Sequence, residues 1–142
     1  MSSIERIVIR QVSRPDKENV KEIIEWFCEV FDLSDKGNEL EPALLREIVS
    51  NSMKGDGVTS KDLTKDLAMP RSTVIYHLNR FIYTGLVIRK GRRYYLRSED
   101  LASTIEEIQA DMFREFGRMI NLAQRMAEMI EVRGQGRRKE KK

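Results

Sequence analysis

Few residues in this sequence have side chains suited to covalent chemistry. Among 142 residues there is a single histidine, His77, and a single cysteine, Cys28. The sequence therefore has no His/Cys cluster that could hold a transition metal, and no paired nucleophile and base. Carboxylates are numerous, but they are scattered at spacings typical of ion-paired helix surfaces. We expect no enzyme, no metal site and no cofactor, and we expect Cys28 to be a buried apolar residue rather than a redox group.

The sequence does concentrate positive charge. Residues 71–98 contain seven Lys and Arg and no Asp or Glu, although the whole chain has 26 basic and 23 acidic residues. A surface that only keeps a protein soluble mixes both signs, so this acid-free segment indicates a face for a polyanion. Residues 134–142 are also basic and contain no apolar residue. We expect them to form a disordered, solvated tail, with an arm that adds sequence-independent DNA affinity as the alternative.

Hydrophobic periodicity and turn residues predict the elements that carry this charge. The β-branched run at 4–12 predicts a short strand. Apolar residues at helical spacing predict four helices, over 16–32, 40–54, 60–68 and 72–84. Residues 86–97 form two β-rich segments around a glycine turn, which predicts a hairpin. The expected helix ends are Asp16, Ser60, and Ser72 or Thr73 as N-caps, Gly85 as a C-cap, and Ser98 as the cap of a final helix.

The final helix is expected to run from Ser98 to about Val132 and to carry a broad apolar stripe. Ile105, Met112, Met119 and Met126 repeat every seven residues, and Leu101, Ile108, Leu122 and Met129 occupy the partner heptad position. The stripe is too wide for a two-stranded coil alone, so we expect a bundle with the 16–32 helix and a second subunit. The predicted dimer interface consists of Ile105, Ile108, Met112, Phe116, Met119, Ala123, Met126 and Ile130.

The order of two helices, a turn, a third helix and a hairpin is that of a winged helix-turn-helix. One segment resembles the ArsR and MarR families of regulators, namely VTSKDLTKDLAMPRSTVIYHLNRFIYTGLVIRKGRRYYL. The positions that carry the resemblance are Leu63, Leu67 and Ala68, then Ser72, Thr73, His77 and Leu78, then Gly85, Leu86 and Val87. The resemblance covers about residues 40–98 and implies a DNA-binding regulator. The Cys-Val-Cys type motif and the His/Asp ligands of metal-sensing ArsR proteins are absent here, which disfavours metal sensing.

A helix over 72–84 with Val74, Leu78, Phe81 and Ile82 turned inward leaves a polar outward face. Asn and Arg can make two-pronged contacts with adenine and guanine edges, and Thr and Ile methyls can meet the thymine methyl. Arg71 and the helix N-terminal amides favour phosphate, and the basic hairpin tip favours the adjacent backbone or minor groove. The predicted DNA-contacting residues are Arg71, Ser72, Thr73, Ile75, Tyr76, His77, Asn79, Arg80, Lys90, Arg92 and Arg93.

Some of these residues have alternatives. Ile75 and Tyr76 could instead cover a dimer partner, and His77 could instead make a structural hydrogen bond. Of Tyr94 and Tyr95, which point to opposite sides of a strand, one is expected in the core. The aromatic residues of the N-terminal region, Trp26, Phe27 and Phe31, are expected to be core, although they could enclose an apolar effector.

We therefore expect a mainly α protein with a small β-hairpin. The expected organisation is an N-terminal strand and amphipathic helix over 1–38, a winged helix-turn-helix over 39–98, a dimerisation helix over 99–133 and a disordered tail over 134–142. The expected function is a homodimeric, sequence-specific transcription regulator on near-palindromic double-stranded DNA, with recognition helices about 34 Å apart. The alternatives are an architectural DNA-binding protein and a protein-contact winged helix. The sequence has no apolar run long enough for a membrane span and no signal peptide, so a cytoplasmic location is expected.

Overall fold

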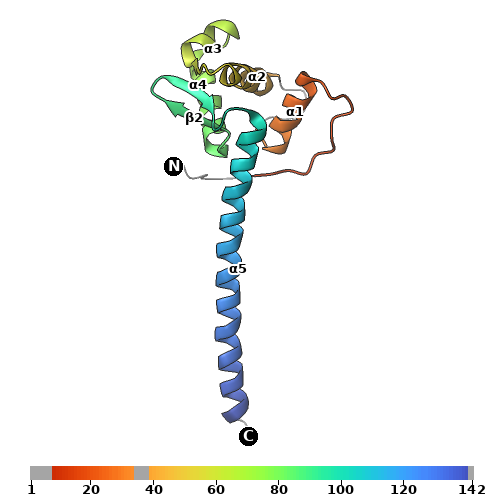
Figure 1. Ribbon diagram of the computed structural model, residues 1–142, viewed down its shortest axis with the longest axis vertical. Coiled ribbons are helices and arrows are strands. Elements are labelled where there is room, and N and C mark those ends of the chain that lie inside the picture. Colours follow the sequence, from red (N-terminus) through yellow and green to blue (C-terminus); the bar gives the residue numbers. More distant parts are fainter. Residues whose placement is uncertain (1–7, 34–38, 141–142) are drawn as a thin grey trace. The chain divides into compact units, whose positions relative to one another are not determined.

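The computed structural model describes residues 8–33 and 39–140, the last six of these by backbone alone (Figure 1). The chain divides into two compact units, Met1–Ile108 and Gln109–Lys142. The fold is mainly helical, with a small antiparallel sheet and a long C-terminal helix, as the sequence predicts. In chain order the elements are α1 (Val20–Val30), α2 (Leu40–Met53), β1 (Val58–Thr59), α3 (Ser60–Asp66), α4 (Arg71–Thr84), β2 (Val87–Lys90), β3 (Arg93–Leu96) and α5 (Leu101–Glu140).

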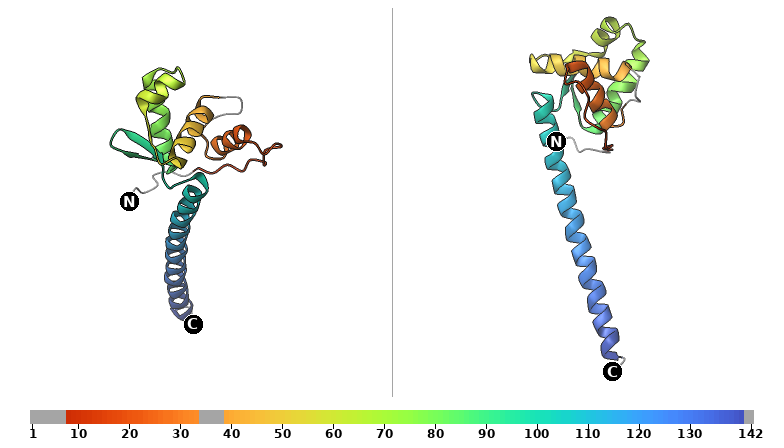
Figure 2. Two further views of the ribbon diagram at one scale, coloured as in Figure 1. Left: turned by 45° about the horizontal axis from the view of Figure 1, so that its top comes forward. Right: turned by 90° about the vertical axis from the view of Figure 1, so that its right-hand side faces the viewer.

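The predicted hairpin is present, and a third strand that the sequence did not reveal joins it. β2 pairs with β3 across Gly91, whose φ of +64° suits a residue without a Cβ. The two-residue β1 pairs with the other edge of β3, with Val58 opposite Tyr94, so the strand order is β1-β3-β2. In Figure 1 α4 lies beside α3 and the hairpin, and in Figure 2 α1 runs alongside α2.

The core of the first unit comes from the inward faces of these helices and the sheet. Val74, Leu78 and Phe81 of α4 are fully buried as predicted, whereas Ile82 is half-buried. Cys28 is also fully buried, and Tyr94 is the buried member of the tyrosine pair. The largest fully buried side chains are Phe81, Leu44, Leu45, Ile48, Leu63, Leu78, Leu86 and Leu96.

Helices α1, α2, α3 and α4 each end in a left-handed residue, and this geometry shapes the turn between α3 and α4. Ala68 follows α3 with a φ of +51°, and Met69 N–H then donates to the Thr64 carbonyl at 3.3 Å. The same pattern ends α2 at Gly55 and α1 at Asp32, whose φ values are +84° and +55°. These are Schellman endings, which satisfy the free carbonyls of the last turn and reverse the chain.

Several expected helix starts are wrong by one to four residues. Asn19 rather than Asp16 caps α1, because its side chain accepts the Glu22 amide at 2.9 Å. Thr59 rather than Ser60 caps α3 by accepting the Asp62 amide at 3.0 Å. α4 begins after Pro70 and has no side-chain cap, so neither Ser72 nor Thr73 has that role. In each case the residue just before the first helical residue has an extended backbone, as an N-cap does.

The two ends of the chain also differ from expectation. Residues 8–12 form no strand, and residues 4–7 of the expected strand lie outside the described residues. Asp100, not Ser98, starts α5, since its carboxylate accepts the Ser103 amide at 2.7 Å. α5 continues to Glu140, so residues 134–140 of the expected disordered tail are helical. Its seven-residue repeat and lack of proline favour such a continuous helix.

Candidate nucleic-acid interface

The outward face of α4 carries a row of polar and aromatic side chains. Ser72, Tyr76 and Asn79 are exposed along this row, with Tyr76 60% exposed. Tyr83 continues the row and is 50% exposed. These residues recur at three- and four-residue intervals, which places them on one side of the helix. The row therefore offers hydroxyl and amide groups at regular spacing along an accessible helix surface.

Tyr83 is a candidate that the sequence prediction missed. Its signal was the continuation of the Tyr76 and Asn79 spacing by one further turn, close to the predicted end of the helix at Gly85. Thr73 and Ile75, which were predicted, are half-buried on the flanks of α4. Compared with the prediction, the exposed row is narrower at the start of α4 and continues further toward the end of the helix.

The N-terminus of α4 is open to an anion. Pro70 occupies the N-cap position, where it has no side chain that could accept a helix amide. The Thr73 and Val74 amides donate to the Pro70 carbonyl, and Arg71 is exposed in the first turn. Uncapped amides at a helix start carry partial positive charge, which attracts phosphate oxygens. Arg71 adds a full positive charge at the same position.

Two predicted contact residues, His77 and Arg80, make contacts within the protein, although the Arg80 side chain is 35% exposed. His77 is buried, and its Nδ1 lies 3.2 Å from Oε1 of Glu41 in α2. Arg80 Nη1 lies 3.6 Å from the same carboxylate, and its Nη2 donates a 3.0 Å hydrogen bond to the Asp32 carbonyl. His77 is thus buried beside Glu41, but its Nδ1 makes no hydrogen bond among the described residues, so the structural hydrogen bond that was the alternative is not observed at this atom. Arg80 lies on the flank of α4 that faces α1 and α2 rather than in the exposed row.

The hairpin presents exposed cations around a glycine turn. Lys90, Arg92 and Arg93 are all exposed. Arg93 Nη1 donates to the Gly57 carbonyl at 3.0 Å, which ties β3 to the segment before β1. Arg89 Nε donates to the Gly91 carbonyl at 2.8 Å and holds the turn. The tip therefore has a held turn from which the exposed Arg92 extends, while Lys90 Nζ lies 5.7 Å from the centroid of the Tyr95 ring.

The charge of residues 71–98 is partly neutralised inside the first unit. Arg97 Nε lies 3.3 Å from Glu107 Oε2 of α5, and Arg80 pairs with Glu41. Among the described residues the other five cations, Arg71, Arg89, Lys90, Arg92 and Arg93, form no ion pair with a carboxylate. Five uncompensated charges remain at the start of α4 and along the hairpin.

The predicted dimer residues divide into two groups. Ile108 is only 2% exposed and Ile105 is half-buried, so both contribute to the packing of the first unit in the single chain. Met112 is half-buried, and the later predicted residues are exposed, namely Phe116, Met119, Ala123, Met126 and Ile130. Phe113, Ile120, Leu122, Met129 and Val132 are at least 50% exposed on the same helix. α5 thus carries a long apolar stripe that nothing within its own unit covers.

Among the described residues, no group of three or more His, Cys, Asp and Glu side chains could hold a metal ion. None of the described helices combines the length and the apolar character required to cross a membrane. Comparison with known protein families, with curated proteins and with solved structures found no match for this chain.

Proposed function

We propose that this chain is a sequence-specific DNA-binding transcription regulator of the winged helix-turn-helix type that acts as a homodimer on a near-palindromic duplex. The observation that carries the proposal is the exposed row of α4, Ser72, Tyr76, Asn79 and Tyr83, beside a hairpin in which four cations, Arg89, Lys90, Arg92 and Arg93, have no acidic partner among the described residues. A helix with exposed polar groups fits the major groove, and a basic hairpin fits the neighbouring phosphates. Together they supply the two contributions that specific DNA binding needs.

In this proposal α4 is the recognition helix. The Asn79 amide can donate to and accept from an adenine edge, and the ring and hydroxyl of Tyr76 can meet a base or phosphate. The uncapped start of α4 and Arg71 would contact phosphate and fix the depth of the helix in the groove. The α3–α4 turn, with its left-handed Ala68, sets the angle between these two helices.

The hairpin would act as the wing. Lys90 and Arg92 extend from a turn that is held by the Arg89–Gly91 hydrogen bond. Each phosphate contact that such a cation makes releases counterions, so the logarithm of the binding constant falls with the logarithm of salt concentration by about 0.9 per contact. Removing one wing cation should therefore reduce the salt slope by about that amount.

The homodimer rests on the apolar stripe of α5. Contiguous apolar side chains that are mostly exposed in one chain are unusual for a soluble monomer and mark an association surface. The seven-residue repeat of Met112, Met119 and Met126 is typical of helices that pack against helices of the same kind. Glu115 interrupts the stripe at the partner heptad position between Ile108 and Leu122, and it forms an ion pair with Arg118 at 3.0 Å.

Sedimentation equilibrium tests the dimer. Met119→Glu combined with Met126→Glu places two charges in the stripe and should yield a monomer, because a buried unpaired carboxylate costs several kcal/mol. Asn121→Glu is the control, since Asn121 is exposed on the helix outside the repeat and should leave the assembly unchanged. A wild-type chain that sediments as a monomer at micromolar concentration would remove this part of the proposal.

Selection of bound sequences from random duplexes tests DNA reading. The expected result is a two-fold symmetric consensus whose affinity exceeds that for random duplex by about a thousandfold or more at fixed salt. Arg71→Ala, Lys90→Ala and Arg92→Ala should weaken binding to all sequences, whereas Arg46→Ala, at an exposed position of α2, is the matched control. No shift of duplex at moderate salt would instead favour a protein-contact winged helix.

An architectural DNA-binding protein is the second candidate. It is favoured by the basic residues of 134–142, five Lys and Arg with one Glu, most of which belong to the end of the helix that extends to Glu140. This candidate predicts similar affinity for the selected and random duplexes and a large loss of affinity when residues 134–142 are deleted. The regulator predicts that the same deletion changes both affinities equally and preserves their ratio.

A further inference from the structure

A buried carboxylate in α2 lies directly behind the exposed row of α4. Glu41 is in the first turn of α2, and its side chain is 4% exposed. Its Oε1 faces His77 Nδ1 at 3.2 Å within ion-pair range, although the two groups lack the alignment of a hydrogen bond, and Oε2 has no hydrogen-bond partner among the described residues. Burial of an incompletely paired carboxylate is costly. Stability alone therefore gives no reason for a carboxylate at this position.

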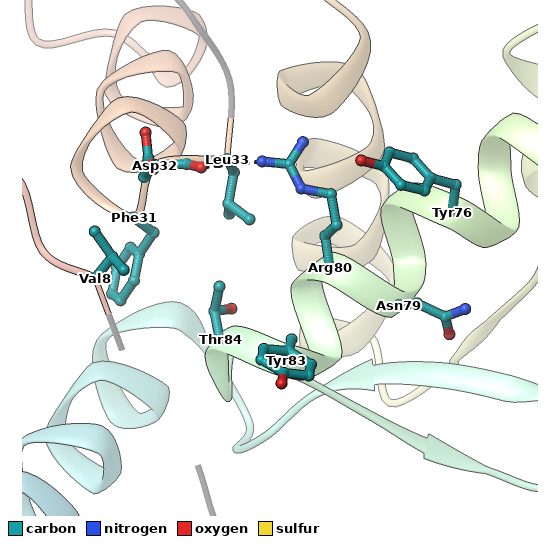
Figure 3. A pocket seen from close by; sticks show the side chains of 9 residues that line it. All are labelled: Val8, Phe31, Asp32, Leu33, Tyr76, Asn79, Arg80, Tyr83 and Thr84. Atoms are coloured by element: carbon teal, nitrogen blue, oxygen red, sulfur yellow. Dashed lines mark hydrogen bonds between the residues drawn. The ribbon is translucent and has the colours of Figure 1, made fainter. Parts of the chain in front are cut away.

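Arg80 connects this carboxylate to the end of α1. One amino group of its guanidinium approaches Glu41, and the other donates to the Asp32 carbonyl at the left-handed residue that ends α1. Figure 3 shows the Arg80 side chain extending between Tyr76 and the Asp32–Leu33 backbone. A cavity of about 340 Å³ lies beside it, with Phe31, Leu33 and Tyr83 among its lining residues. Because this space separates the end of α1 from α4, the Arg80 fork is a direct polar link between them.

The ring of Tyr76 contacts two residues of the same group, His77 and Arg80. Its ring centroid lies 5.1 Å from that of His77 in an edge-to-face arrangement, and Arg80 Cζ lies 5.9 Å from the Tyr76 centroid. Both geometries are attractive, since an aromatic face is negative and its edge is positive. Tyr76 is the exposed residue at the middle of the row, so its ring links His77 and Arg80 to the surface of α4.

We propose that Glu41, His77 and Arg80 form a positioning cluster that fixes the rotation of α4 and the ring of Tyr76, and that Arg80 itself does not contact DNA. This inference rests on the proposed function. The guanidinium is committed to α2 and to the end of α1, so it has little freedom to reach a base edge or a phosphate. Its effect on DNA binding is on sequence discrimination, because discrimination depends on how precisely Tyr76 and Asn79 are placed. The cluster contributes nothing to counterion release.

The test compares Arg80→Ala, Glu41→Gln and the control Arg92→Ala in the full-length chain. Affinities for the selected duplex and for random duplex are measured over a salt series. Arg92→Ala should reduce the salt slope by about 0.9 and preserve the affinity ratio. Arg80→Ala should leave the slope unchanged and lower the ratio at least fivefold. Glu41→Gln removes the charge at nearly constant volume and should lower the ratio in the same way.

A second readout needs no DNA. In Glu41→Gln, the nuclear magnetic resonance signals of the Tyr76 and His77 rings should shift, while those of the hairpin tyrosines stay in place. Lys at position 80 carries the charge but cannot span both partners, so Arg80→Lys should behave like Arg80→Ala.

Four outcomes would overturn the inference. A reduced salt slope in Arg80→Ala would make Arg80 a phosphate contact, and a loss of discrimination confined to one base pair would make it a reader of that base. An unchanged affinity ratio in Glu41→Gln would remove the role of the carboxylate, even if Arg80→Ala fails to fold. A wild-type chain without sequence preference would instead end the proposed function, and the inference with it.

Discussion

Substitution of Gly57 by alanine should disturb the packing of β3 against the segment before β1. A Cβ at this position would lie 2.7 Å from Tyr95 Cζ and 2.9 Å from Arg93 Cβ. Carbon atoms attract at about 3.5–4.0 Å, so the added methyl group would be closer than contact by roughly 1 Å. Arg93 Cβ belongs to a strand and Tyr95 is half-buried, so neither can move without shifting β3. Overpacking of this kind costs about 1–3 kcal/mol.

The fluorescence of Trp26, the only tryptophan, reports unfolding of the first unit. We expect Gly57→Ala to lower the free energy of unfolding in urea by about 1–3 kcal/mol and the melting temperature by at least about 4 °C. DNA affinity should fall as well, because Arg93 donates to the Gly57 carbonyl and this bond helps to place the wing. Combining Gly57→Ala with Tyr95→Ala removes two of the three closest contacts, so the double variant should cost less than the sum of the single ones.

Gly117 in α5 is the matched control. A Cβ there would meet nothing within 4 Å. Gly117→Ala should therefore stabilise the helix by about 0.5–1 kcal/mol, as is usual for alanine in a helix interior. If Gly57→Ala unfolds at the same urea concentration as the wild type, the close approach of Tyr95 and Arg93 to Gly57 is wrong, and so is the reasoning that places the wing by it.

Three further substitutions test local features by urea unfolding. Ala68→Gly should raise the free energy of unfolding by up to about 1 kcal/mol, because Ala68 has a φ of +51°. The control Ala102→Gly, in α5, should lower the free energy of unfolding by about 1 kcal/mol. Equal losses of stability in both variants would contradict the left-handed turn. Thr59→Ala should lower the free energy of unfolding by about 1 kcal/mol, because the cap on the Asp62 amide is lost. Thr59→Ser keeps a hydroxyl and should retain most of the wild-type stability. A serine variant as unstable as the alanine variant would argue against the cap. The Ser103 backbone amide and side chain hold the pKa of Asp100 below its usual 3.8. Folding then favours the carboxylate, so the advantage of the wild type over Asp100→Asn should be full at neutral pH and should shrink as the pH falls from 3.8 through the lowered pKa; an advantage that grows on acidification would contradict this.

Much of the fold follows from local sequence, for clear physical reasons. The helical spacing of Val74, Leu78 and Phe81 predicted the inward face of α4, because burial of apolar area selects one side of a helix. Gly85 ends α4 with a φ of +87°, as expected of the residue without a Cβ penalty. The glycine between two β-rich segments predicted the hairpin. The acid-free segment predicted where uncompensated positive charge would gather, and five of its seven cations have no acidic partner among the described residues.

Other features depended on contacts between distant segments. Asp16 and Asn19 are both suitable N-cap residues, and Asn19 is the one that caps α1. The chain before α1 also packs against the helix, where the Trp26 indole donates to the Val12 carbonyl at 3.2 Å. β1 has two residues and no pattern of its own, and it is a strand only because β3 offers a free edge. Helix geometry alone put Arg80 on the outward polar face of this helix, as a predicted contact with DNA.

The sequence by itself determined the helices, the hairpin and the surface where positive charge gathers, because propensity, periodicity and net charge are local properties of the chain. Tertiary structure alone decided that two of the predicted outward residues of α4, His77 and Arg80, make contacts within the protein. Glu41 is far from His77 and Arg80 in the sequence but lies within 3.2 Å and 3.6 Å of their nitrogen atoms, and its buried charge draws both side chains inward. Electrostatic attraction acts through space, so no spacing along the chain could have predicted that partner.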